Sequence, residues 1–165
     1  MTMEAAITDF VLETFRLNGC LLASGDALVA DLGLTSARWQ VLGAAALSPA
    51  PLSVAQIARN MGLTRQAVQR LANEMAADGL VRFAPNPHHQ RAKLVLLTAA
   101  GKTAFAAAMK RQAAWASALG KGLGVRDVAA AATTLRTIRQ RLEMEKITKA
   151  TTPIKERSHA QSASA

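Results

Sequence analysis

The chain has 165 residues, half of them hydrophobic, one cysteine and a formal net charge of +9. This length and hydrophobic content suit one compact domain with a sizeable core better than two independent domains. One cysteine excludes an internal disulfide framework and a cysteine-based zinc site, and no apolar stretch reaches the length of a membrane span. The start of the chain also lacks the basic opening of a secretory signal, so we expect a cytoplasmic protein.

The positive charge is unevenly distributed along the chain. Residues 1–52 carry two basic and five acidic groups, residues 53–97 carry six and two, and residues 98–165 carry twelve and four. The central excess supplies the cations that contacts to nucleic-acid phosphates require. Residues 146–165 are rich in Thr, Ser and Ala and are interpreted as a disordered basic tail, which either adds nonspecific affinity for nucleic acid or, as we favour, only aids solubility.

The first third of the chain predicts two helices and a break. A helix is expected over residues 3–31, and Thr35 is the expected N-cap of a second helix over residues 36–47. Ser48-Pro49-Ala50-Pro51 ends that helix, and a strand of one or two residues is expected at Leu52. The apolar stripe of the first helix comprises Ile7, Val11, Leu12, Phe15, Leu22 and Leu28. The inward-facing positions of the second are Trp39, Leu42 and Ala46.

The next stretch predicts a helix, a turn and a further helix. Ser53 followed three residues later by Gln56 is a capping box, in which each side chain satisfies a backbone N–H at a helix start. A helix therefore begins at Val54, and Gly62 can adopt the left-handed conformation that ends it. Thr64 is a suitable N-cap for the second helix, which runs to about residue 78.

One face of this second helix has the chemistry that reads DNA bases. Arginine reads guanine bidentately, and glutamine or asparagine can do the same for adenine. The alternative is an ordinary solvated helix face, but such faces usually mix in acids that repel phosphate, and here Glu74 and Asp78 come only after the first turns. The polar face comprises Arg65, Gln66, Gln69, Arg70 and Asn73. The opposite, packing face comprises Ala67, Val68, Leu71, Ala72 and Met75.

Two short β-favouring runs, residues 80–83 and 93–97, then flank a polar loop over residues 85–92. Two prolines make this loop a stiff projection rather than a two-residue turn, and its Arg91 is suited to a DNA minor groove. His88 and His89 could be considered metal ligands. Neighbouring loop residues rarely bind one ion together, and no carboxylate or cysteine lies close by, so contact with DNA or simple exposure is favoured.

This order of elements, with LGLTSARWQVL before it and LTAAGK after it, resembles the MarR family of bacterial transcriptional regulators. The resemblance covers about residues 3–145. The loop of that family usually reads Asp-x-Arg-Asp-x-Arg, and this chain has Asn86, His88, His89 and Arg91 at those positions. Only the last arginine is retained, so the sequence does not decide how strongly, or in what pose, this loop binds DNA.

The resemblance implies a mainly α (α+β) fold, a winged helix-turn-helix with a helical dimerisation region formed by N- and C-terminal helices. Residues 1–145 then form a single domain, with dimerisation helices over residues 1–34 and 99–145 and a DNA-binding lobe over residues 35–98. The last two helices are expected over residues 99–119 and 125–145, separated by glycines. A C2 dimer presents two recognition helices about one turn of DNA apart, so the operator should be a pseudo-palindrome. The alternative is that these helices only complete a monomer core.

The leading functional hypothesis is therefore a ligand-responsive repressor that binds double-stranded DNA as a homodimer. Arg91 is expected in the minor groove, with Ser53 or Lys93 as phosphate contacts and His88 and His89 beside them. The alternative is a winged-helix protein-interaction module that has lost DNA binding. The recognition helix is expected to contribute Thr64, Arg65, Gln66, Gln69 and Arg70.

The resemblance also implies a small effector, a lipophilic or aromatic acid held between the dimerisation helices and the DNA-binding lobe. Arg16 suits its carboxylate and Trp39 its ring, although Trp39 is equally consistent with plain core. Cys20, beside Gly19 and Leu21, is expected to be a buried structural cysteine rather than a peroxide sensor. No cofactor, metal or catalytic activity is expected, because the chain has no phosphate-binding loop or nucleophile motif.

Overall fold

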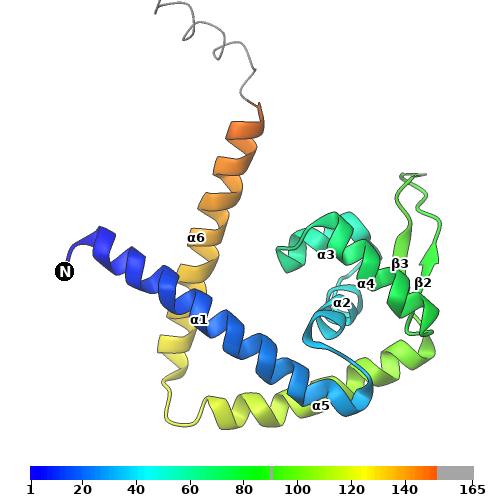
Figure 1. The fold of residues 1–165 in the computed structure, drawn as a ribbon, viewed down its shortest axis with the longest axis horizontal. Helices are drawn as coiled ribbons and strands as arrows, with labels where there is room; N and C mark the ends of the chain where they lie inside the picture. The colour runs from blue at the N-terminus through cyan, green and yellow to red at the C-terminus, as the bar shows by residue number, and fades with distance from the viewer. Residues whose placement is uncertain (90, 152–165) are drawn as a thin grey trace, which may run out of the picture. The chain divides into compact units, whose positions relative to one another are not determined.

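The computed structural model describes residues 1–89 and 91–151, with side chains described as far as Glu145. It divides into two compact units, residues 1–119 and the segment that begins at Gly120. The elements of the first unit are α1 (Met3–Val29), the 3₁₀ turn η1 (Ala30–Leu32), α2 (Ser36–Ala46), β1 (Leu52–Ser53), α3 (Val54–Met61), α4 (Arg65–Ala77), β2 (Val81–Ala84), β3 (Leu94–Leu97) and α5 (Ala99–Leu119) (Figure 1). The second unit contains α6 (Val125–Thr151).

The three strands form one antiparallel sheet in the order β1-β3-β2. Val81 pairs with Leu97 and Phe83 with Val95, so β2 and β3 are the arms of a hairpin that projects beyond α3 and α4 (Figure 1). Leu52 pairs with the other edge of β3, also at Val95. The predicted hairpin and the short strand at Leu52 are confirmed, with strand ends that differ by at most one residue from the expected ones.

The predicted helix-turn-helix is confirmed together with its caps. Ser53 and Gln56 form the capping box of α3, and Gly62 ends that helix in the left-handed conformation with φ of 66°. The Thr64 side chain accepts a hydrogen bond from the backbone N–H of Ala67 at 3.2 Å, which starts α4. Gly79 follows α4 with φ of 72°. The ends of α3 and α4 and the turn between them are therefore set by residues close in sequence.

The core lies between α2, α3, α4 and the sheet, and it fixes which face of α4 points outward. Val68, Ala72 and Met75 are fully buried, as the apolar arc of α4 predicts. Leu42 of α2 is buried as expected, but Ala46 is exposed. The expectation for Ala46 was wrong because α2 ends at this residue and the chain turns away from the core.

Helix α5 follows β3 and packs against α1. Thr98 donates its hydroxyl to the carbonyl of Gly79 at 2.6 Å and accepts from the N–H of Gly101, which fixes the start of α5. A Cβ on Gly101 would lie 2.0 Å from the carbonyl oxygen of Leu80, so only glycine allows this approach. Further along α5, Trp115 donates its indole N–H to the hydroxyl of Ser24 on α1 at 3.0 Å.

Much of the apolar stripe predicted on α1 is exposed within the chain. Ile7, Leu12 and Phe15 all retain substantial exposure, with Phe15 at 70%. The same holds for α6, where Val128, Leu135 and Leu142 are exposed. Each of these helices therefore carries apolar surface that the described residues of its own unit leave exposed.

Helix α6 continues to Thr151, past the expected end at Glu145, so the proposed disordered tail does not begin at residue 146. The remaining tail, residues 152–165, lies outside the described residues. Among the described helices none is long and apolar enough to cross a membrane alone, and α1 with its 3₁₀ turn reaches that threshold only jointly with α2, across an 81° bend.

Candidate nucleic-acid interface and ligand cavity

A groove between α3, α4 and the hairpin collects most of the residues predicted to contact DNA. Arg65 and Gln69 enter it from α4, while Arg91 and Lys93 enter it from the hairpin. These residues are separated in sequence but face a common space, and three of the four are cations at neutral pH. The other residues that line the groove are Ser53, Val54, Ala55, Gln56, Arg59, Asn73, Phe83, Asn86, His88, His89 and Ala92.

The groove also contains residues that the sequence did not single out as DNA contacts. Arg59, in the last turn of α3, is exposed and adds a further cation. Its position facing α4 depends on the packing of the two helices, so only its charge was visible in the sequence. By contrast, Ser53 is only 7% exposed, and its hydroxyl donates a hydrogen bond to Gln56 at 2.8 Å. The hydroxyl predicted to contact a phosphate is therefore already hydrogen-bonded within the chain.

The exposed flank of α4 carries the remaining predicted readers. Gln66 and Arg70 lie beside Arg65 and Gln69 on this flank, and Thr64 is exposed at the helix start. Gln69 donates its amide to the side-chain carbonyl of Asn73 at 3.0 Å. The face is therefore polar and outward-pointing, as the sequence predicts, but it is organised by hydrogen bonds along the helix.

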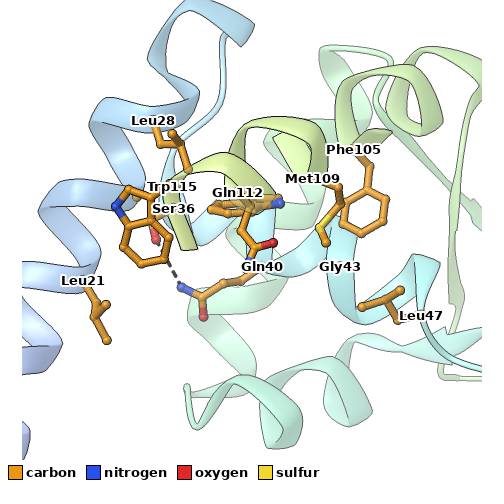
Figure 2. A pocket seen from close by; sticks show the side chains of 12 residues that line it. Leu21, Leu28, Ser36, Gln40, Gly43, Leu47, Phe105, Met109, Gln112 and Trp115 are labelled. Atoms are coloured by element: carbon orange, nitrogen blue, oxygen red, sulfur yellow. Dashed lines mark hydrogen bonds between the residues drawn. The ribbon is translucent and has the colours of Figure 1, made fainter. Parts of the chain in front are cut away.

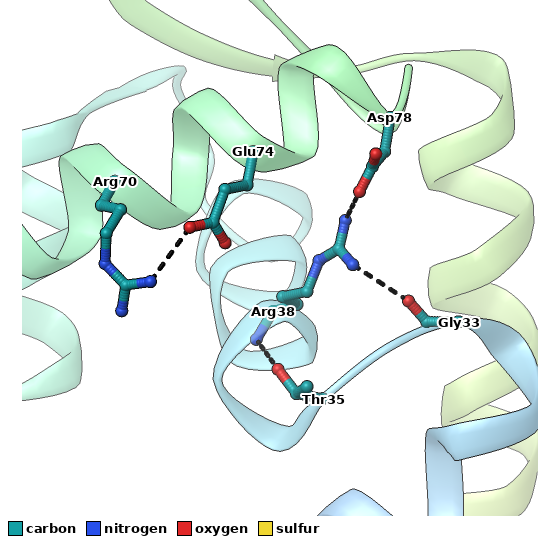
Figure 3. A network of polar contacts seen from close by, with 6 residues as sticks. All are labelled: Gly33, Thr35, Arg38, Arg70, Glu74 and Asp78. Atoms are coloured by element: carbon teal, nitrogen blue, oxygen red, sulfur yellow. Dashed lines mark hydrogen bonds and ion pairs between the residues drawn. The ribbon is translucent and has the colours of Figure 1, made fainter.

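Glu74 belongs to this same flank. Arg70 donates to the Glu74 carboxylate at 3.0 Å, because residues four apart lie one above the other on a helix (Figure 3). Glu74 does come after the first turns of α4, as noted from the sequence, but its carboxylate reaches back to Arg70. Arg70 is ion-paired in the free chain, whereas no ion pair involves Arg65 in the described residues.

The hairpin tip is a turn organised by Asn86. Its side-chain carbonyl accepts a hydrogen bond from the backbone N–H of His88 at 3.0 Å, and its backbone carbonyl accepts from the N–H of His89 at 3.2 Å. The amide oxygen of asparagine makes the contact that an aspartate would make at this position. Both histidines and Arg91 remain exposed around the turn.

A polar network joins the end of α4 to α2. Arg38 donates to the carbonyl of Gly33 at 3.2 Å and forms an ion pair with Asp78, the C-cap residue that follows α4 (Figure 3). The Arg38 side chain is only 18% exposed, and its Nε is buried without a partner in the described residues. The backbone N–H of Arg38 in turn donates to the hydroxyl of Thr35.

A cavity of about 330 Å³ lies within residues 1–119, between α1, α2 and α5. Trp39 lines it, as expected for an effector pocket, but Arg16 does not. Arg16 is exposed and forms an ion pair with Glu13 at 3.1 Å instead. The lining comprises Leu21, Gly25, Leu28, Ser36, Trp39, Gln40, Gly43, Leu47, Phe105, Met109, Gln112 and Trp115 (Figure 2). From the sequence, the pocket residues named were Arg16 and Trp39, and no residue of α5 was among them.

Comparison with known proteins identifies the family of this chain. A model of the MarR family matches residues 32–92, from the end of η1 through the hairpin tip. The crystal structure of a MarR-family transcriptional regulator from Rhodococcus sp. RHA1 superimposes with a TM-score of 0.69 at 25% identity, over 84% of this chain and 95% of that one. The chain belongs to the MarR family of transcriptional regulators.

Two further proteins are similar to this MarR-family chain. An uncharacterized protein of Mycobacterium tuberculosis is 39% identical over 109 residues, which are 66% of this chain and 75% of the relative. CouR from Rhodococcus jostii RHA1, solved bound to p-coumaroyl-CoA, is 25% identical with a TM-score of 0.68, over 74% of this chain and 86% of CouR. The predicted family and the predicted winged helix-turn-helix are both confirmed.

The MarR-family helix α1 presents Cys20 on its exposed surface. The expectation of a buried cysteine was wrong for the single chain, because this face of α1 packs against no other described residue closely enough to cover the thiol. Within the described residues, no group of three or more histidine, cysteine or acidic side chains is arranged to hold a metal ion.

Proposed function

We propose that this MarR-family chain is a repressor that reads a pseudo-palindromic operator as a homodimer. The observation that carries the proposal is the groove in which Arg65 and Gln69 of α4 face Arg91 and Lys93 of the hairpin. A helix in the major groove and a projecting loop in the adjacent minor groove would contact the same stretch of duplex from two sides. A dimer bound across a promoter blocks polymerase without any further contact, which favours repression.

Each group has a role that follows from its chemistry. Arg65, Gln66, Gln69 and Arg70, with Thr64 at the helix start, would read base edges, because guanidinium and amide groups match guanine and adenine. Arg91 would enter the minor groove. The remaining cationic and imidazole groups of the groove, on Arg59, Lys93, His88 and His89, would contact phosphates and so hold the register of the complex without reading sequence.

Dimerisation is supported by the uncovered apolar surface of α1 and α6. Residues 1–34 and 99–145 would form the dimerisation region, with residues 35–98 as the DNA-binding lobe. Exposed Leu12 and Phe15 on α1, and exposed Leu135 and Leu142 on α6, are the side chains that a second copy would cover. Two-fold symmetry then presents two copies of α4, which explains why the operator should be an inverted repeat.

An effector role for the cavity is favoured by its lining. Trp39, Trp115, Phe105 and Met109 surround a space of about 330 Å³, which is the size and character of a small-molecule site. CouR, a protein of the same fold, was solved with p-coumaroyl-CoA bound. We propose that a small aromatic or lipophilic ligand occupies the cavity and lowers operator affinity.

Selection of bound sequences from random duplex DNA tests the proposal directly. Recovery of one inverted repeat with half-sites about ten base pairs apart is expected for a dimeric reader. Arg65→Ala should then cost about 1–3 kcal/mol in operator binding and relax the preference at one base, if Arg65 reads that base. Arg136→Ala, which removes the same charge from exposed α6, is the matched control and should bind as the parent does.

Recovery of nothing above background would favour the alternative of a protein-interaction module. The altered hairpin sequence, with Asn86, His88 and His89, would then matter more than the basic face of α4. Equal operator binding by Arg65→Ala, Arg70→Ala and the parent would contradict the assignment of α4 as the recognition helix. A reporter placed behind the recovered operator would distinguish repression from activation.

A further inference from the structure

The cavity between α1, α2 and α5 has a lining without any charged side chain. Its polar groups are all neutral, namely the hydroxyl of Ser36 and the amides of Gln40 and Gln112. The rest of the lining is aromatic, aliphatic or glycine. This differs from the sequence-based expectation, in which an arginine in the pocket receives the carboxylate of an acidic ligand.

The arginines nearest to the cavity in sequence are already committed elsewhere. Arg38 precedes Trp39, but its guanidinium is bound to Asp78 and the carbonyl of Gly33. Arg111 precedes Gln112, but it is bound to Asp31, with 2.7 Å between Nη2 and Oδ2, and to the carbonyl of Leu28. Neither is among the lining residues, and turning either one inward would break an ion pair.

A carboxylate lies directly behind one of the polar lining residues. Asp26 on α1 accepts a hydrogen bond from the backbone N–H of Ser36, which lines the cavity. This carboxylate would repel an anion placed beside Ser36. An anion that gives up water against this uncharged lining gains no cationic partner in return, so the site disfavours a ligand with an ionised acid.

The neutral polar groups suit a different head group. Gln40 and Gln112 project between the ring of Trp115 on one side and Phe105 on the other (Figure 2). Gln40 makes only a long hydrogen bond of 3.4 Å to Ser36, and no hydrogen bond of the Gln112 side chain occurs among the described residues. The two amides therefore offer both donors and acceptors beside an aromatic surface.

We propose that the cavity selects uncharged aromatic ligands with a hydrogen-bonding head group, such as a carboxamide, and discriminates against the corresponding carboxylates. The inference rests on the proposed effector role of the cavity, which it makes more specific. The aromatic lining supplies the apolar contact area, and Gln40 and Gln112 recognise the head group.

The test compares naphthalene-2-carboxamide with naphthalene-2-carboxylate at pH 7.5, using the full chain. Trp39 and Trp115 are the only two tryptophans in the sequence and both line the cavity, so their indole N–H signals in a ¹H–¹⁵N NMR spectrum report binding directly. The amide should shift these signals with a dissociation constant at least about tenfold lower than that of the carboxylate. Gln112→Lys should reverse the preference, whereas Ala113→Lys, on an exposed position of α5, should not.

Two results would overturn the inference. One is tighter binding of the carboxylate by the parent chain, and the other is the absence of any shift with either compound up to its solubility limit. Gel shifts with the selected operator test the effector role separately from ligand binding. If the amide binds but leaves DNA affinity unchanged, the ligand selectivity is supported and the effector role is contradicted. If only the carboxylate releases DNA, the effector role is supported and the ligand selectivity is contradicted.

Discussion

Arg70 and Glu74 form an ion pair on the outward face of α4, with 3.0 Å between Nη1 and Oε1. Both side chains are substantially exposed, at 72% and 48%, so the pair adds little to folding stability. Its consequence concerns DNA instead. A phosphate or base that binds Arg70 must compete with Glu74, and the carboxylate itself would approach the phosphate backbone.

Glu74→Gln should therefore strengthen DNA binding. We expect a gain of about three- to tenfold in affinity at physiological salt, because one repulsive charge is removed and Arg70 is released. Fluorescence anisotropy with a labelled operator measures the change. Glu143→Gln is the matched control, since Glu143 forms the same type of pair with Arg139 on α6, at 2.7 Å. An equal gain in both variants would show that only the net charge matters.

Arg38 and Asp78 connect α2 to the end of α4. Because Arg38 is largely buried, its replacement by methionine should lower the free energy of unfolding by about 1–3 kcal/mol, whereas Asp78→Asn, at a more exposed position, should cost less than about 1 kcal/mol. Urea denaturation measures both. A double variant whose loss equals the sum of the single losses would show that the pair contributes no coupling energy.

The fold was largely predictable because its signals are local. The capping box at Ser53, the left-handed Gly62 and the cap at Thr64 each act within a few residues, and they set the helix-turn-helix. The predictions that were wrong concerned side chains whose surroundings depend on residues distant in sequence. The absence of Arg16 from the cavity could not be seen before the placement of α1 was known, and neither could the exposure of Cys20.

The candidate site was predictable only in part. The polar face of α4 follows from helical periodicity, but the groove is also lined by Arg59 of α3, which periodicity does not place there. The lining of the cavity was less accessible to prediction. Phe105, Met109 and Trp115 recur along α5 in a manner typical of packing, and only the structure separates a packed residue from one that faces a cavity.

The Asp31–Arg111 pair should make stability depend on acid pH. The hydrogen bond from the Arg111 guanidinium lowers the pKa of the Asp31 carboxyl below its usual value of 3.8. The folded state therefore favours the ionised carboxylate. The resulting stabilisation is complete above pH 3.8 and is lost as the pH falls through the lowered pKa.

The Asp31→Asn variant tests this dependence. Its melting temperature should lie below that of the parent at pH 6, and the difference should shrink in stronger acid, where the parent carboxyl is protonated. Thermal unfolding from pH 6 to pH 2 measures it. Asp9→Asn, on an exposed part of α1, serves as the control. A constant difference across the whole range would mean that the pair is not responsible.

Peroxide should not release the chain from DNA despite the exposure of Cys20. A reactive thiol needs a cationic neighbour or a helix N-terminus, and Cys20 lies within α1 between Gly19 and Leu21. Within the described residues, no ion pair or hydrogen bond involves its side chain. Gel shifts before and after peroxide treatment should be identical. A peroxide response that disappears in Cys20→Ser would contradict this prediction.

Phe15→Asp should convert the proposed dimer to monomers. Phe15 is 70% exposed in the single chain, so an aspartate there is harmless to the fold but places an unpaired charge in an interface that covers α1. Light scattering coupled to size exclusion, over a range of concentrations, measures the mass. Leu63→Asp, in the turn between α3 and α4 and 45% exposed, should remain dimeric. If Phe15→Asp stays dimeric as well, the dimer interface lies elsewhere, and the exposed stripe on α1 requires another explanation.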